Sequence, residues 1–121
     1  MFEASSRQER AEKDRFFFVK SEYKLVKIKL DDILYIEGLK DYIKIYLDKD
    51  QKPVISLMSM KKLDEYLPSP EFLRTHRSFI VHMTKVTTVD RQRIVFDSKY
   101  IPISESYKNE ISEYLNTHTL L

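Results

Sequence analysis

The stretch FLRTHRSFIVH, residues 72–82, decides the fold of this chain of 121 residues. Phe79, Val81 and Met83 alternate with their neighbours, and a period of two predicts a strand with one buried face. The same period continues outward in both directions. It predicts strands at residues 16–19, 24–30, 33–37, 42–47, 54–56, 79–83, 86–89, 93–96 and 100–103. We therefore expect a mainly β domain.

Residues 74–78, Arg-Thr-His-Arg-Ser, predict a loop that leads directly into the strand at Phe79. An arginine held on such a base can donate two hydrogen bonds to O6 and N7 of guanine, and a serine can bind a phosphate. The composition equally allows a plainer interpretation, in which Arg74 and Arg77 only solvate the loop.

Two segments interrupt the strand pattern and predict two short helices. Met60, Leu63 and Leu67 have helical spacing in residues 59–67, and prolines follow at positions 68 and 70. The second helix begins near Ser104, a candidate N-cap. Its buried face would be formed by Tyr107, Ile111, Tyr114 and Leu115.

Residues 1–14, MFEASSRQERAEKD, contain few strongly apolar side chains and no strand alternation. We interpret them as a solvated linker from an upstream domain, with a frayed helix or a cloning boundary as the alternatives. The folded domain would then comprise residues 15–121.

Composition excludes several classes of protein. The chain has no cysteine, which excludes disulfides and thiolate metal sites, and its single glycine, Gly38, excludes a P-loop or dinucleotide fingerprint. No apolar run approaches the ~18 residues of a membrane span, so we expect a soluble, cytoplasmic protein. His76 and His82 are only two imidazoles without a carboxylate at ligand spacing. We expect no catalytic residue, metal or cofactor.

Charge and loop chemistry indicate a polyanionic partner. The formal net charge is only +2, but residues 71–93 carry five basic and two acidic side chains. A second candidate loop, residues 38–42, carries Lys40 and Tyr42. A third candidate is the start of the last helix, where Ser106 and Lys108 could assist phosphate binding. Taken alone, the second candidate is better explained as a simple hairpin, and the third as an ordinary helix N-cap.

Together these segments resemble the LytTR DNA-binding domain, the output module of bacterial LytR/AlgR-type response regulators. The resemblance covers residues about 16 to 115 and rests on ILYIE (33–37), DY (41–42), Leu63, Leu67, FLRTHRSFIV (72–81), IPIS (101–104) and Tyr107. It implies an elongated set of small antiparallel sheets with two short helices. It also implies loops that enter successive major grooves of promoters with paired direct repeats. An upstream receiver domain and a homodimer on DNA are further expectations.

The resemblance also implies roles for individual residues. Arg77 matches the main base-reading position, and His76 would shape its loop. The remaining DNA-binding positions are Lys40 and Tyr42 near bases or phosphates, and Ser78, Ser106 and Lys108 on the DNA backbone.

Three positions depart from the family pattern. His82 stands where asparagine is frequent, and Glu105 where arginine is common and often contacts DNA. The glycine usual in the hairpin before Ile101 is missing, and residues 97–99 are Asp-Ser-Lys. Glu105 would repel phosphate or accept a hydrogen bond from N4 of cytosine. We expect an altered base preference with DNA binding retained.

The leading hypothesis is sequence-specific binding of double-stranded DNA for transcriptional regulation in a bacterial two-component system. The main alternative is a protein-interaction module, because eight tyrosines and seven phenylalanines could form an aromatic surface. A third alternative is single-strand binding, with Tyr42 and Tyr46 as stacking platforms. An enzyme is not supported.

Overall fold

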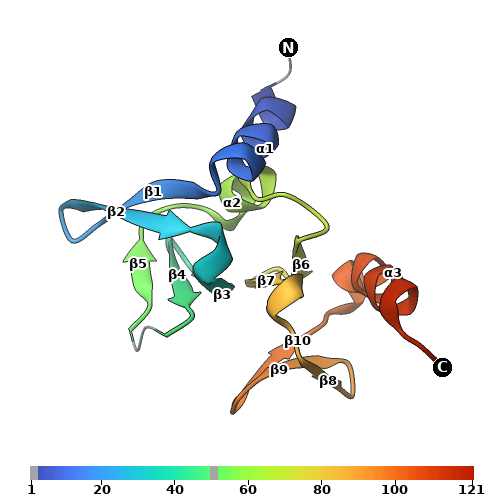
Figure 1. Cartoon of the computed structure of the whole chain (residues 1–121). Coiled ribbons are helices and arrows are strands. Elements are labelled where there is room, and N and C mark those ends of the chain that lie inside the picture. Colours follow the sequence, from blue (N-terminus) through green and yellow to red (C-terminus); the bar gives the residue numbers. More distant parts are fainter. Residues whose placement is uncertain (1–2, 50–51) are drawn as a thin grey trace.

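The computed structural model describes residues 3–49 and 52–121, with side chains from residue 8 onward. Small antiparallel sheets dominate it, as the sequence predicted, and helices flank them (Figure 1). Within these described ranges, no helix is long and apolar enough to cross a membrane.

The largest sheet has five strands, which lie in the order β5-β4-β3-β7-β6 with every neighbouring pair antiparallel. Tight hairpins connect β3 to β4 and β6 to β7, because only two residues separate the strands of each pair. The strands of this sheet are β3 (Ile33–Leu39), β4 (Tyr42–Leu47), β5 (Val54–Ser56), β6 (Phe72–His76) and β7 (Phe79–His82).

Two smaller sheets complete the β structure. One is a hairpin and the other has three strands in the order β10-β9-β8. Their strands are β1 (Phe16–Ser21), β2 (Lys24–Lys29), β8 (Thr88–Asp90), β9 (Arg93–Phe96) and β10 (Lys99–Pro102). Short 3-10 turns, η1 (Leu30–Asp32) and η2 (Met83–Lys85), connect these sheets to the central one.

The first of the two expected helices is α2 (Met60–Tyr66). Ser59 caps it, since its Oγ accepts a hydrogen bond of 3.1 Å from the backbone N of Lys62. The helix ends at Tyr66 with Leu67 as its C-cap, directly before Pro68, close to the limit that the sequence predicted. Its Tyr66 packs edge-on against Phe17 of β1 with 5.3 Å between ring centroids, which holds the β1–β2 hairpin to the helix.

The last helix, α3 (Lys108–His118), follows the 3-10 turn η3 (Glu105–Tyr107). The prediction that Ser104 caps this helix with its side chain was wrong, because that side chain makes no capping hydrogen bond. The 3-10 turn starts the helix instead. The backbone N of Ser104 donates to the carbonyl of Thr75 at 2.8 Å, which holds the start of η3 against β6.

A third helix, α1 (Glu3–Asp14), occupies the segment interpreted as a linker. Ala11 is completely buried and belongs to the same apolar core as Leu63 of α2, so the second half of α1 packs on the domain. Figure 1 shows α1 beside α2 at the end of the molecule near the N-terminus. The domain boundary at residue 15 stays a prediction.

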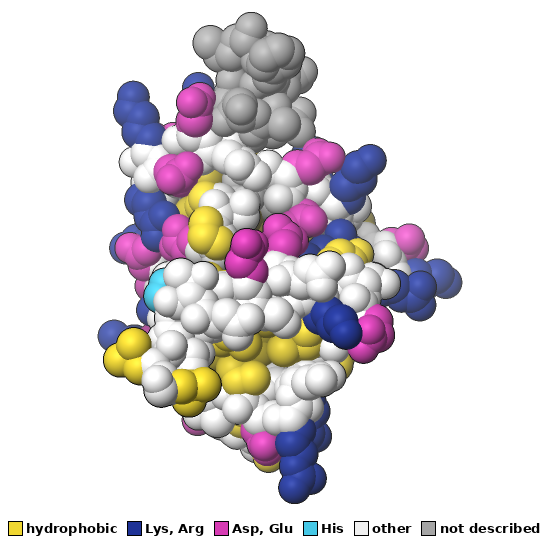
Figure 2. All heavy atoms as spheres, turned by 90° about the vertical axis from the view of Figure 1, so that its right-hand side faces the viewer, with side chains coloured by type: hydrophobic (Ala, Val, Ile, Leu, Met, Phe, Trp, Pro, Cys, Tyr) yellow, Lys and Arg dark blue, Asp and Glu magenta, His cyan; other side chains and the backbone are white. Residues whose placement is uncertain are grey.

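The central sheet separates two apolar cores. On β7, Ile80 points into the core beneath α1 and α2, while Phe79 and Val81 point into the core shared with β8–β10 and α3. This alternation is the period of two seen in the sequence. On α3, Ile111 is buried in the second core, with Tyr114 packed beside it. The face on the α3 side mixes basic and acidic side chains, with apolar atoms visible below the helix (Figure 2).

Candidate nucleic-acid interface

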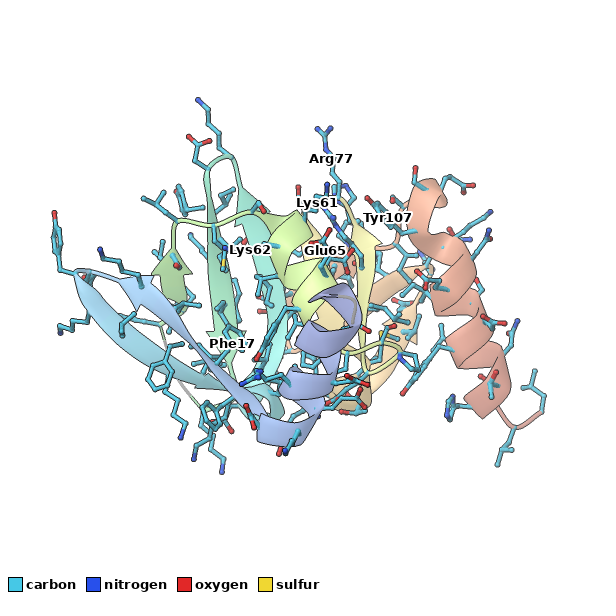
Figure 3. All side chains as sticks on the ribbon, turned by 90° about the horizontal axis from the view of Figure 1, so that it is seen from above. Phe17, Lys61, Lys62, Glu65, Arg77 and Tyr107 are labelled. Atoms are coloured by element: carbon cyan, nitrogen blue, oxygen red, sulfur yellow. The ribbon has the colours of Figure 1, made fainter. Side chains whose placement is uncertain are left out.

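The sheet topology brings the β3–β4 and β6–β7 turns to the same end of the central sheet. Glu37 pairs with Phe79 across the antiparallel strands β3 and β7. Beyond this pair, the backbone N of Gly38 donates to the carbonyl of Ser78 at 2.8 Å. Figure 3 shows both turns and the N-terminal end of α3 along one side of the molecule, with Arg77 pointing outward. We call this surface the turn face. It comprises Lys40, Asp41, Tyr42, Arg77, Ser78, Ser106 and Lys108.

The β6–β7 turn consists of Arg77, which is exposed, and Ser78, which is half-buried. The backbone N of Ser78 donates to Nδ1 of His76 at 3.1 Å. On the other side of the turn, Nη2 of Arg74 donates to the carbonyl of Arg77 at 2.5 Å. Two side chains of β6 therefore fix the backbone that carries Arg77, while its own guanidinium stays exposed.

Arg74 and His76 lie within strand β6 and not in the predicted loop. The side chain of Arg74 is only 18% exposed, so the interpretation that it solvates a loop is wrong. The strand extends this far because Arg74 pairs with Ile80, and His76 with Phe79 after a register shift. Only residues 77 and 78 form the turn.

The β3–β4 turn is formed by Lys40 and Asp41, both exposed, and Tyr42 follows as the first residue of β4. Lys40 adopts a φ of 51°, the left-handed region that non-glycine residues rarely occupy. Gly38 serves a different purpose: a Cβ there would lie 2.6 Å from Cγ of Met60. The missing side chain allows the start of α2 to approach the turn face.

The third part of the turn face is the η3–α3 segment, where Ser106 and Lys108 are exposed. Nζ of Lys108 lies 3.0 Å from Oε1 of Glu105, and their side chains are 48% and 82% exposed. The unusual carboxylate at position 105 thus forms an ion pair with a predicted DNA-backbone contact. Because both groups are solvated, the pair is easily broken.

Two basic residues near the turn face were not predicted from the sequence. Lys61 is exposed in the first turn of α2, on the side of the helix nearest Arg77 (Figure 3). Lys99 of β10 lies with Nζ 5.4 Å from the ring centroid of Phe79, beside the β6–β7 turn. The sequence could not find them because their approach depends on how α2 and β10 pack on the central sheet.

Of the two tyrosines that the single-strand alternative would use for stacking on bases, Tyr42 and Tyr46, only Tyr42 is exposed. Tyr46 stacks on Tyr35 with 4.4 Å between centroids, and its hydroxyl donates to Glu37 at 3.2 Å. Burial raises the pKa of Tyr46, and it raises that of Tyr35 to about 12. Tyr46 is therefore a packing residue and not a free stacking platform, whereas Tyr42 is 36% exposed.

The two central histidines are engaged in separate hydrogen bonds. His76 accepts from Ser78, whereas His82 contacts the carbonyl of Ile33 at 2.8 Å and Oε2 of Glu71 at 2.9 Å. In the described part of the chain, no three His, Cys, Asp or Glu side chains gather in a way that could hold a metal ion.

The two structural departures from the family pattern are accommodated locally. His82 is buried with both ring nitrogens within hydrogen-bonding distance of acceptors. In the hairpin before Ile101, Asp97 adopts a φ of 51°, a conformation that aspartate tolerates better than most residues. The missing glycine therefore does not prevent the turn.

An apolar groove lies between the β1–β2 hairpin and β5, away from Arg77. Its volume is about 630 Å³. Tyr23 and Leu57 on its walls are 98% and 79% exposed. Tyr42, a residue of the turn face, also lines this groove. This is the surface that the protein-interaction alternative would use.

Comparison with known proteins identifies the family of this chain. The family profile of the LytTr DNA-binding domain matches residues 23–116. The sensory transduction protein LytT of Enterococcus faecalis is 24% identical over 113 residues, which are 88% of this chain and 46% of that protein. LytT of Bacillus anthracis is 26% identical over 100 residues, 78% of this chain and 40% of that protein. This chain thus spans less than half the length of these relatives.

A solved structure has the same fold. The LytTr DNA-binding domain of a Bacillus cereus protein superposes with a TM-score of 0.69 at 19% identity, covering 84% of this chain and 96% of that one. Its sheets and helices correspond to the mainly β architecture described above. Because the family profile covers most of the sequence, this chain belongs to the LytTR family of DNA-binding domains, which are not enzymes.

Proposed function

We propose that this domain binds a specific sequence in double-stranded DNA and thereby regulates transcription, reading the major groove with the turns of its turn face. The observation that supports this most directly is the exposed guanidinium of Arg77 on a backbone fixed by Arg74 and His76. Because the backbone is fixed before DNA binds, less conformational entropy is lost when the Arg77 side chain takes its bound position.

In this proposal, Arg77 donates two hydrogen bonds to O6 and N7 of a guanine. Ser78 binds a phosphate beside it. Lys40 and Tyr42 contact the neighbouring bases or backbone from the β3–β4 turn. Ser106 and Lys108 hold the DNA backbone on the other side of Arg77, which fixes the register of the domain on the duplex.

We further propose that the domain is the output part of a cytoplasmic response regulator in a bacterial two-component system. The LytT relatives are sensory transduction proteins, and each is more than twice as long as its matched segment. A receiver domain would precede α1, and phosphorylation there would favour a homodimer on paired direct repeats. Residues 1–14 would join the two domains.

The test begins with selection of bound duplexes from a randomised DNA library at about physiological salt, followed by sequencing. Binding of the selected duplex is then measured by fluorescence anisotropy. Arg77→Ala should weaken it about 5- to 150-fold and relax the preference at one base pair. Arg10→Ala is the matched control, because Arg10 is an exposed arginine of α1. Figure 3 shows this helix on the side of the molecule opposite Arg77.

Two results would contradict parts of the proposal. Uniform weakening of all sequences by Arg77→Ala would make Arg77 a phosphate contact and not a base reader. Absence of both an enriched motif and low-salt binding would remove double-stranded DNA as the ligand.

The apolar groove supports a second candidate function, binding of a partner protein. Tyr23 and Leu57 on its walls are highly exposed large apolar side chains, and such exposed apolar patches are typical of protein interaction sites. Salt separates the two functions: DNA binding weakens steeply as salt increases, whereas an aromatic protein interface changes little. Substitution of Leu57 by Ser should affect only the protein partner.

A further inference from the structure

Arg74 is the residue of β6 that connects the parts of the turn face. Its Nη2 donates to the carbonyl of Arg77 at 2.5 Å, and its Nη1 lies 3.8 Å from Oδ2 of Asp64 on α2. Its guanidinium carbon lies 5.6 Å from the ring centroid of Tyr107 in η3. One guanidinium therefore contacts the β6–β7 turn, α2 and the segment that precedes Lys108.

Stability alone does not explain this arginine. Its Nε atom is buried and has no hydrogen-bond partner among the described residues. A buried donor without a partner destabilises a fold, so an apolar side chain would suit this position better if packing were its only role. The charge of Arg74 faces Asp64 and the ring of Tyr107, and its side chain is mostly withdrawn from solvent.

We propose that Arg74 is a positioning residue for DNA readout, which sets the direction of Arg77 and its distance from the η3–α3 segment. This inference rests on the proposed function. The guanidinium is planar and presents its donors in a fixed fork, so it can bind the Arg77 carbonyl while it packs on Tyr107 and faces Asp64. A lysine has a single charged nitrogen and cannot maintain these three contacts together. Arg74 would act through Arg77 and would not itself contact DNA.

The experiment is a double-mutant cycle on the duplex selected by the unmodified domain, with Arg74→Lys, Arg77→Ala and the double variant. Arg74→Lys should weaken binding about 5- to 30-fold and relax the preference at the base pair that Arg77 reads. In the Arg77→Ala background, the same substitution should cost less than about twofold. A residue that only maintains the fold would weaken binding without changing base preference.

Asp64→Asn is a second variant that disturbs the fold less, because the Asp64 side chain is 43% exposed. It removes the charge that Arg74 faces but keeps Arg74 itself. It should weaken binding about two- to fivefold, and this effect should also disappear in the Arg77→Ala background. Thermal unfolding of each variant shows whether it is folded. Should Arg74→Lys fail to fold, the double-mutant cycle of Asp64→Asn with Arg77→Ala tests the positioning role in its place.

The outcomes separate this inference from the function on which it rests. If no duplex binds the unmodified domain, both are overturned. A different result overturns only the positioning role. In that case the domain binds the duplex and Arg77→Ala weakens the binding, but the fold-changes of Arg74→Lys and Arg77→Ala multiply in the double variant, so Arg74 acts independently of Arg77.

Discussion

His82 and Glu71 share a hydrogen bond of 2.9 Å between Nε2 and Oε2 at the base of the β6–β7 hairpin. The other ring nitrogen, Nδ1, lies 2.8 Å from the carbonyl oxygen of Ile33. Both ring nitrogens of this buried imidazole are thus engaged, one by the side chain of Glu71 and the other by the backbone of Ile33. The base of the hairpin is thereby tied to the start of β3.

Glu71 also connects this hairpin to the end of α1. Its two carboxylate oxygens accept hydrogen bonds of 2.9 and 2.7 Å from Arg15, whose Nη2 also donates to Asp31. The Glu71 side chain is only 22% exposed, and in glutamine an amide nitrogen replaces one of its two acceptor oxygens, so at least one donor from Arg15 or His82 loses its acceptor. We expect Glu71→Gln to lower the free energy of unfolding by about 1–3 kcal/mol, measured with urea.

The control for Glu71→Gln is Glu12→Gln, which removes the same charge from an exposed position of α1. It should change stability by less than about 0.5 kcal/mol. Equal effects of the two substitutions would show that the contacts of Glu71 contribute nothing specific.

The same network predicts a dependence of stability on pH. Hydrogen bonds from Arg15 hold the pKa of Glu71 and of Asp31 below their usual values. A carboxyl whose pKa is lower in the folded state contributes stability above its unfolded pKa, and this stability is lost as pH falls through the folded pKa. The free energy of unfolding should therefore decrease below about pH 5. Arg15→Gln should flatten this decrease, whereas Lys13→Gln should not.

The measurement is urea unfolding of the three proteins at several pH values between about 3 and 7. Parallel curves for the unmodified domain and Arg15→Gln would exclude Arg15 as the cause of the acid sensitivity.

Most of the fold was predictable because local patterns determine it. Alternation defined the strands, and Ser59 with Pro68 defined the limits of α2. A helix at residues 1–14 was only an alternative to a linker, because the burial of α1 depends on Ala11 meeting α2, a contact between segments distant in the sequence. The Ser104 cap was predicted wrongly because a 3-10 turn, which sequence patterns do not distinguish from the first turn of an α-helix, starts the last helix.

The candidate site was predictable to a smaller degree. The sequence identified Arg77 and Lys40 as loop residues, and the structure brings their turns to one end of the sheet. It could not show that Arg74 is inside a strand, because arginine in a polar run is typical of a loop. Nor could it show that Glu105 is paired with Lys108, since side-chain direction at a 3-10 turn depends on packing.

Because Lys40 has a left-handed backbone conformation, its replacement by glycine should change stability and DNA affinity in different directions. A non-glycine residue at a φ of 51° is strained, so Lys40→Gly should leave the free energy of unfolding unchanged or raise it by up to ~1 kcal/mol. Loss of the ammonium should nevertheless weaken binding of the selected duplex about 3- to 10-fold. Lys40→Asn, which tolerates this φ, should weaken binding equally. Urea unfolding and fluorescence anisotropy measure the two effects.

Lys49→Gly is the control for Lys40, because Lys49 has a φ of 75° and is exposed, but follows the opposite end of β4. It should give the same change in stability without a change in DNA affinity. If both glycine variants bind as well as the unmodified domain, Lys40 is not part of the interface.

The Glu105–Lys108 ion pair predicts that this domain binds DNA more weakly than its charge allows. Phosphate must compete with a carboxylate 3.0 Å from Nζ of Lys108. Glu105→Gln should raise affinity for all duplexes about two- to fivefold and steepen the salt dependence by up to about one unit. Stability should change by less than about 0.5 kcal/mol, because the pair is exposed. Anisotropy titrations at several salt concentrations measure both effects of binding.

Glu110→Gln, an equal change of charge in the first turn of α3, should give a smaller increase, since Glu110 forms no ion pair with Lys108. The opposite result for Glu105 is equally informative. If Glu105→Gln weakens the selected duplex and leaves other sequences unchanged, the carboxylate accepts a hydrogen bond from N4 of cytosine. Position 105 would then read a base, and its departure from the usual arginine would change the preferred sequence and not only the affinity.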